Sequence, residues 1–165
     1  MKTLIIYDSV TGKTELMCAS LQQSLFGEMV RIPESRPYNR ITVYLRGIPG
    51  ALHGVGCAIR PIEEDVSSYE RIVLASPVWV DRVIPPITAF LQSYDLKGKE
   101  VHALLTYGTT AKKAPLQMKA LIEAAEARCA SVVCIRSDTE LLKRLKSGKT
   151  ALRLDSERGI YLADP

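Results

Sequence analysis

The sequence predicts an α/β domain in which a doubly wound parallel sheet lies between two layers of helices. Short apolar runs at residues 4–7, 72–75 and 101–107 are continuous rather than alternating, which is typical of strands covered on both faces. Helix-forming stretches separate these runs, and that alternation favours parallel strands. A length of 165 residues, 47% hydrophobic and 24% charged, fits one globular domain and excludes a disordered or coiled-coil chain. We therefore expect residues 1–165 to form a single domain.

Each element follows from a local pattern of apolar residues and of residues that end or cap helices. Pro85 and Pro86 suit the first turn of a helix, where a missing N–H is tolerated. Asp138 is placed to cap the last helix. Five strands in one domain predict a three-layer sandwich. The expected order is strand 2–8, helix 12–26, strand 28–32, strand 71–78, helix 83–94, strand 101–107, helix 115–128, strand 131–135 and helix 138–145.

Two segments fall outside this alternation. Residues 34–61 form an irregular insertion with three prolines and four glycines, too long for an ordinary connection. We expect it either to cover a functional site, with Tyr38 or Tyr44 near the ligand, or to contain helical pieces or a dimer contact. Residues 150–165 form a tail of unpredicted structure. It belongs to a basic region in which residues 143–158 hold six basic and two acidic side chains, and this region is expected to be solvated.

Charge and cysteine content exclude several classes of protein. The 22 basic and 18 acidic residues give a net charge of +4, too small an excess to favour nucleic-acid binding. No apolar run approaches the length that crosses a bilayer, and no export signal is visible, so a cytoplasmic protein is expected. The four cysteines form no Cys-x-x-Cys pair and have no histidine at ligand spacing. They predict reduced, packed thiols and no metal site.

In doubly wound sheets, ligands bind beyond the carboxyl ends of the strands. The first such loop places hydroxyls and a glycine at the start of a helix, where free N–H groups and the helix dipole favour an anion such as phosphate. A plainer alternative is that Ser9 and Thr11 only cap the helix. The Gly-Lys-Thr sequence at 12–14 is not a nucleotide-triphosphate loop, because that motif needs a glycine where Tyr7 stands. The loop residues are Ser9, Val10, Thr11, Gly12, Lys13 and Thr14.

The second and third loops add aromatic side chains at the same edge of the sheet. Trp79, the only tryptophan, offers a flat face to a planar ligand, or else packs in the core. Tyr107 and Gly108 offer a second aromatic ring and a flexible position. Together the three loops suit a phosphorylated planar ligand. The further candidate residues are Pro77, Val78, Trp79 and Val80 in the second loop, and Thr106, Tyr107 and Gly108 in the third.

These motifs resemble those of the flavodoxin family. Residues 7–14 are similar to its phosphate loop, residues 76–79 with Pro85-Pro86 to its second flavin loop, and residues 101–108 to the strand that enters the third loop. The resemblance covers residues 1–135 in order, and residues 44–54 are similar to a subgroup described as NAD(P)H-dependent oxidoreductases. It implies a flavodoxin-like fold with five parallel strands in the order 2-1-3-4-5.

The resemblance also implies a non-covalent FMN cofactor. Ser9, Thr11, Gly12 and Thr14 would hold its phosphate, and the second and third loops would border its ring. The sequence departs from the family at three places. It has Val80, Asp81 and Arg82 where a small residue and a glycine are usual, Lys13 where Asn is frequent, and Thr109 and Thr110 where a further glycine is usual.

We therefore expect an FMN-binding redox protein that transfers electrons from NAD(P)H or a protein donor to a quinone, a small acceptor or a partner protein. The net charge of +4 contrasts with acidic flavodoxin carriers, and no acid–base catalytic residue stands out. Whether the protein is a reductase or a carrier stays open, and a homodimer is possible. The alternative is a flavin-free interaction or regulatory module. A phospho-receiver domain is excluded, because Ser76-Pro77 stands where its acceptor aspartate would be.

Overall fold

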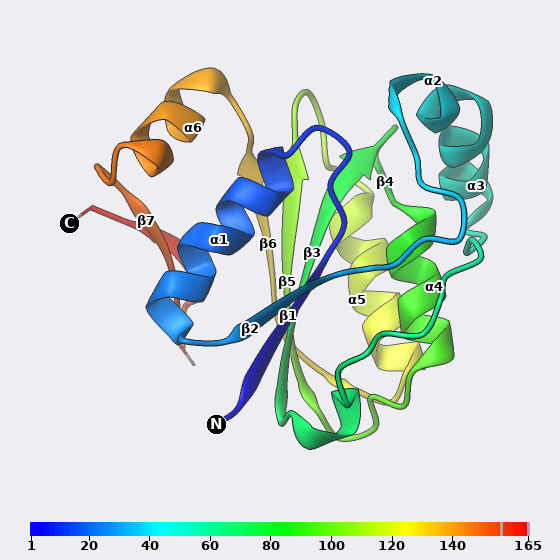
Figure 1. Cartoon of the computed structure of the whole chain (residues 1–165), viewed down its shortest axis with the longest axis horizontal. Helices are drawn as coiled ribbons and strands as arrows, with labels where there is room; N and C mark the ends of the chain where they lie inside the picture. Colours follow the sequence, from blue (N-terminus) through cyan, green and yellow to red (C-terminus); the bar gives the residue numbers. More distant parts are fainter. Residues whose placement is uncertain (156, 165) are drawn as a thin grey trace.

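The computed structural model describes residues 1–155 and 157–164 and shows an α/β sandwich (Figure 1). Helices α1 and α6 cover one face of the main sheet, and α4 and α5 cover the other. The strands are β1 (Thr3–Tyr7), β2 (Glu28–Arg31), β3 (Arg71–Trp79), β4 (Arg82–Val83), β5 (Glu100–Tyr107), β6 (Arg128–Arg136), β7 (Ala151–Asp155) and β8 (Gly159–Ala163). The α-helices are α1 (Lys13–Leu25), α2 (Arg40–Thr42), α3 (Ile48–His53), α4 (Pro85–Ser93), α5 (Ala114–Ala124) and α6 (Thr139–Lys146).

The main sheet has six strands, so the expected count of five is wrong. Its path runs β2-β1-β3-β5-β6 with all neighbours parallel, and β4 pairs antiparallel with the end of β3. With β4 included, the order no longer reads 2-1-3-4-5 in chain numbering. The extra strand arises because β3 continues to Trp79 and the chain turns back through Val80 and Asp81, so that Trp79 pairs with Arg82. A two-residue turn of this kind suits the twist of a hairpin.

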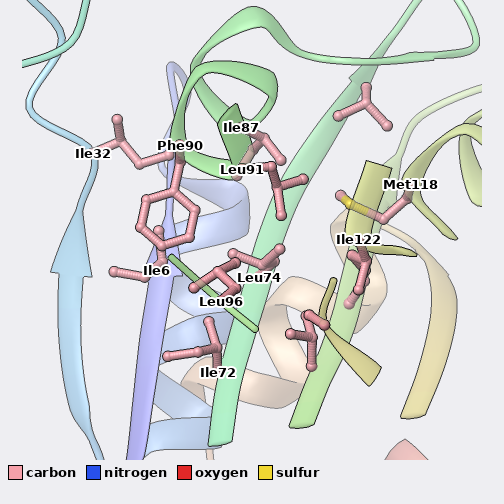
Figure 2. Packing of buried hydrophobic residues seen from close by; sticks show 14 of the residues in the cluster. Ile6, Ile32, Ile72, Leu74, Ile87, Phe90, Leu91, Leu96, Met118 and Ile122 are labelled. Atoms are coloured by element: carbon pink, nitrogen blue, oxygen red, sulfur yellow. The ribbon is translucent and has the colours of Figure 1, made fainter. Parts of the chain in front are cut away.

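Side chains alternate between two buried cores, one on each face of the sheet. Leu4 and Ile6 of β1 point into the core beneath α4 and α5, where Phe90 is among the largest fully buried side chains (Figure 2). Ile5 and Tyr7 point the other way, into the core beneath α1. This explains the continuous apolar runs of the sequence, since a strand covered on both faces has no solvent-facing side. Parallel pairing of β1 with β3 and of β3 with β5 brings the carboxyl ends of the three strands to one edge.

The insertion contains helical pieces, which confirms that part of the expectation for residues 34–61. Helix α2, a π-helical turn at Val43–Gly47 (η1) and α3 follow one another without a break. Asn39 starts this segment, because its side chain accepts hydrogen bonds from the N–H groups of Ile41 and Thr42. A short 3-10 turn, η2 (Val66–Ser68), precedes β3.

The C-terminal tail forms a hairpin of β7 and β8 that packs beside α1 and was not predicted. Two serines one helical turn apart on α1 bond to β7. The N–H of Leu152 donates to Ser20 Oγ over 3.0 Å, and Ser24 Oγ donates to the carbonyl of Leu152 over 3.0 Å. These bonds satisfy backbone groups of a strand edge that would otherwise attract another chain. Ser156 and Pro165 of the predicted tail lie outside the described residues.

Candidate functional site

The first loop leads directly from β1 into α1. Gly12 is the N-cap residue and has a left-handed backbone, with φ of 78°, which glycine adopts without strain. Within the described residues, no side chain caps this helix, so the alternative role of Ser9 and Thr11 as caps is wrong. A Cβ at Gly12 would meet no heavy atom within 4 Å. The start of α1 is therefore open, with first-turn N–H groups available to an anion.

A buried hydrogen bond joins the first loop to the third. The hydroxyls of Thr14 and Thr106 lie 2.7 Å apart, and either one can donate. Both residues are buried, although they are 92 positions apart in the sequence. The Thr14 side chain thus contacts Thr106, and the backbone N–H of Thr14, in the first turn of α1, is also available to a ligand. Sequence reasoning placed both threonines at the site but did not connect them.

The second loop is the hairpin turn between β3 and β4. Pro77, Val78 and Trp79 are half-buried and Val80 is exposed. The turn gives Val80 a φ of 49° and Asp81 a φ of 62°. A left-handed backbone is unusual for any residue with a Cβ and more so for a β-branched one, so Val80 is strained. The Asp81 side chain accepts a hydrogen bond of 3.0 Å from the N–H of Lys113, which ties this loop to the start of α5.

Trp79 packs against the insertion. Its ring meets that of Tyr38 edge-on, with 5.2 Å between centroids and 77° between planes. On another side lies the backbone of Gly47, where a Cβ would stand 2.5 Å from Trp79 Cζ3. The insertion therefore packs over the second loop, and the tyrosine that meets Trp79 is Tyr38, whereas Tyr44 is exposed. Part of the tryptophan surface is thus used for internal packing.

The third loop lines a hollow at the same edge of the sheet. Gly108 is exposed, and a Cβ there would meet no heavy atom within 4 Å. A larger hollow, of about 560 Å³, lies between α1 and the β7–β8 hairpin, away from the three loops. The hollow at the third loop has a volume of about 310 Å³ and is lined by Tyr107, Thr109, Thr110, Ala111, Lys112 and Cys134.

Sequence reasoning missed a pair of buried carboxyl groups beside the first loop. Asp8 is fully buried and its Oδ1 accepts from Arg31 Nε at 3.2 Å. Asp8 Oδ2 and Glu34 Oε2 are buried and have no donor among the described residues while both groups are ionised. Burial, followed by the charge of Asp8 and a hydrogen bond to it, raises the pKa of Glu34 to about 8. A protonated Glu34 can therefore donate to Asp8 near neutral pH.

The sequence did not predict the position of Glu34, because this residue lies in the irregular insertion and no local pattern shows which segment the insertion pairs with. Glu34 forms a β-bridge with Ile59, and the N–H of Ser35 donates to the carbonyl of Ala58 over 3.0 Å. Nearby, burial raises the pKa of the Cys57 thiol to about 11 and that of Tyr38 to about 12. Both side chains therefore stay protonated at neutral pH.

Several solved structures share this fold. A flavoprotein from Lactobacillus acidophilus, solved in complex with FMN, has a TM-score of 0.69 and 23% identity, over 86% of this chain and 97% of that one. A protein from Bacteroides eggerthii, described provisionally as a flavoprotein, has a TM-score of 0.71 and 20% identity, over 88% and 94%. The two-electron reduced flavodoxin of Megasphaera elsdenii has a TM-score of 0.59 and 19% identity, over 87% and 94%. No family model matches the chain, and a search of curated proteins finds no match.

The chain therefore has a flavodoxin-like fold with a mainly parallel central sheet. None of the helices in residues 1–155 and 157–164 is both long and apolar enough to cross a membrane. The same residues contain no cluster of three or more histidine, cysteine, aspartate or glutamate side chains that could hold a metal ion. The loops at the carboxyl ends of β1, β3 and β5 are the candidate site, because ligands of doubly wound sheets bind beyond that edge.

Proposed function

We propose that this chain is an FMN-binding redox protein. The observation that carries the proposal is the uncapped start of α1 at Gly12, joined to the third loop by the bond between Thr14 and Thr106. The fold it shares with an FMN-bound flavoprotein and with a flavodoxin supports the same function. A phosphate group suits a helix start with free N–H groups, and the sheet edge beside it offers room for a ring.

The residues present fit the phosphate of FMN. The open space at Gly12 lets an anion approach the backbone, and Ser9 and Thr11 add hydroxyl donors. Lys13 is exposed and supplies one positive charge at the helix start. The negative charge of the buried Asp8 is opposed by Arg31 at 3.2 Å, and a proton on Glu34 keeps the pair from carrying two charges.

The ring of FMN would lie between the second and third loops. Pro77, Val78, Trp79 and Val80 border one side, and Thr106, Tyr107 and Gly108 border the other. When bound, FMN supplies the capacity to accept and pass on electrons or hydride. The chain binds and orients it, and the insertion over Trp79 excludes water from one side.

The electron donor in this proposal is NAD(P)H or a donor protein, and the acceptor is a quinone, another small molecule or a partner protein. Arg82, Lys112 and Lys113 stand beside the second and third loops and would attract the phosphates of a dinucleotide. Hydride transfer between two aligned rings needs no side-chain acid or base, because orientation supplies much of the catalysis. The reductase role thus suits the basic charge better than the carrier role does.

The test is a titration of the purified protein with FMN and, separately, with riboflavin, followed by flavin fluorescence. We expect saturable quenching with FMN and much weaker binding of riboflavin, because riboflavin lacks the phosphate that α1 would hold. Gly108→Ala adds a matched probe: its Cβ touches no protein atom, so the fold should be unchanged while the close approach of the ring is blocked. Equal affinity for FMN in this variant would place the ring elsewhere.

A flavin-free interaction module is the second candidate, because the protein itself occupies part of the second loop. Tyr38 and Gly47 cover Trp79, and the turn at Val80 and Asp81 closes β3 onto β4. If neither flavin binds and the purified protein is folded, this candidate replaces the redox proposal.

A further inference from the structure

The helical segment at residues 39–53 exposes four of its large apolar side chains, while Val43 and Ile48 are half-buried. Ile41, Tyr44 and Leu45 are 70%, 72% and 71% exposed, and Leu52 is 49% exposed. Their exposure places them on the outer side of the segment, away from the buried Gly47 and Ala51. Gly47 and Ala51, which are small, are the buried residues of the same segment. A surface helix of an isolated domain normally shows the reverse arrangement.

The inner side of this segment is closely packed against Trp79 of β3 and Pro85 of α4. A Cβ at Gly47 would stand 2.5 Å from Trp79 Cζ3, and one at Gly50 would stand 3.0 Å from Pro85 Cγ. Small residues are therefore needed for the segment to lie close to β3 and α4. The inner side has no room for the side chains of Ile41, Tyr44 and Leu45. Their apolar surface is therefore exposed to solvent in the isolated domain. In Figure 1, α2 and α3 form a corner of the molecule.

The charge around these side chains has one sign. Residues 35–62 contain no aspartate or glutamate, and all four of their arginines, Arg36, Arg40, Arg46 and Arg60, are exposed. Arg36, Arg40 and Arg46 flank the apolar residues in the sequence. We call Ile41, Tyr44, Leu45 and Leu52, with these three arginines, the insertion face. Its occupant must offer apolar contact and negative charge together.

We propose that the insertion face binds the surface of an anionic lipid bilayer. An interfacial helix buries one apolar side among the acyl chains while its basic residues meet the lipid headgroups. A second copy of this chain fits poorly, because a two-fold contact would place arginines against arginines. A groove in an acidic protein would grip a helix around much of its circumference, whereas here half of it is held by Trp79 and Pro85. A bilayer surface needs only the exposed half.

The test is co-sedimentation of the full chain with vesicles of phosphatidylcholine alone and of phosphatidylcholine mixed with phosphatidylglycerol. We expect binding to the anionic vesicles and little to the neutral ones. The triple variant Ile41→Ser, Tyr44→Ser, Leu45→Ser should lower the partition coefficient at least about tenfold, because the apolar anchor is lost. Arg36→Gln, Arg40→Gln and Arg46→Gln should each lower it about fivefold, and only with anionic vesicles.

Phe26→Ser is the matched control, because Phe26 is 96% exposed and lies at the end of α1, outside the insertion. It should bind vesicles as the wild type does. Circular dichroism and thermal melting should show that every variant is folded, as expected for substitutions of exposed side chains. The proposal fails if wild type binds neither vesicle, or if Phe26→Ser loses binding while the triple variant keeps it. Dimerisation of wild type that the triple variant abolishes would assign the face to a second copy instead.

Discussion

The hydroxyls of Thr14 and Thr106 meet at 2.7 Å inside the protein and join the start of α1 to the end of β5. This contact links the first loop to the third, beyond the strand pairing that places both loops at one edge. One of the two hydroxyls spends its proton on this bond, and the one that accepts keeps its own O–H. The site is therefore defined by how the loops are held together as much as by which residues they carry.

Thr14→Val should lower the free energy of unfolding by about 1–3 kcal/mol. Valine has the shape of threonine but no hydroxyl, so the Thr106 hydroxyl would stay buried without a partner. The double variant Thr14→Val, Thr106→Val should lose less than the sum of the two single variants, because no polar group is then stranded. Urea unfolding of the four proteins measures this coupling. Strictly additive losses would show that the bond contributes nothing.

Val80→Gly should raise the free energy of unfolding by about 1 kcal/mol. Valine at a φ of 49° carries a steric cost of about 1–2 kcal/mol, and glycine removes it, partly offset by the greater freedom of glycine in the unfolded chain. Val80→Ala keeps the Cβ and is the control, with a smaller gain. Chemical denaturation compares all three proteins. A loss of stability in Val80→Gly would mean that the exposed valine side chain makes a contact worth more than the strain.

Gly47→Ala should lower stability by about 1–3 kcal/mol, because its Cβ would overlap the Trp79 ring and force the insertion away from β3. The comparison is Gly108→Ala, whose Cβ meets nothing and whose effect should stay within about 0.5 kcal/mol. Tryptophan fluorescence should also shift to the red in Gly47→Ala only, as water reaches the ring. Identical emission spectra in the two variants would show that the insertion does not pack against the Trp79 ring.

The raised pKa of Glu34 predicts a loss of stability at rising pH. Between its unfolded value of 4.5 and its folded value of about 8, the folded protein binds the proton more tightly than the unfolded chain does. Stability from this group is therefore present below pH 4.5 and falls as the pH rises through about 8. Glu34→Gln keeps an N–H donor toward Asp8 and should flatten this slope.

The measurement is the free energy of unfolding of wild type and Glu34→Gln across pH 5–9, by urea denaturation. Only the difference between the two curves belongs to Glu34, because other groups titrate in both. Parallel curves would show that folding does not raise the pKa of Glu34.

The sequence was sufficient to predict the strands and helices that have an unbroken pattern of apolar residues or a recognisable cap. The apolar runs located β1, β2, β3, β5 and β6, and the predicted cap at Asp138 is present, accepting from the N–H of Leu141 at 2.8 Å. The three loops could be placed at one edge because parallel strands end at the same side. The α/β sandwich followed from the alternation of strands and helices, and its flavodoxin-like character followed from a resemblance that the solved structures bear out.

The remaining features depend on contacts that no local pattern encodes. Strand β4 needs a left-handed turn at Val80 and Asp81, residues that rarely adopt one, so nothing in the sequence marked a hairpin there. The pairing of Asp8 with Glu34 depends on the path of the insertion. The β7–β8 hairpin is stabilised beside α1 by Ser20 and Ser24, which are distant in sequence.

The central claim is that the start of α1 and the three loops hold FMN, and a crystal structure of the protein grown with FMN tests it most directly. The account predicts the phosphate within hydrogen-bond distance of the backbone N–H groups at residues 11–14, with the ring between Trp79 and Tyr107. A flavin bound elsewhere, or crystals that stay free of flavin at saturating FMN, would contradict it.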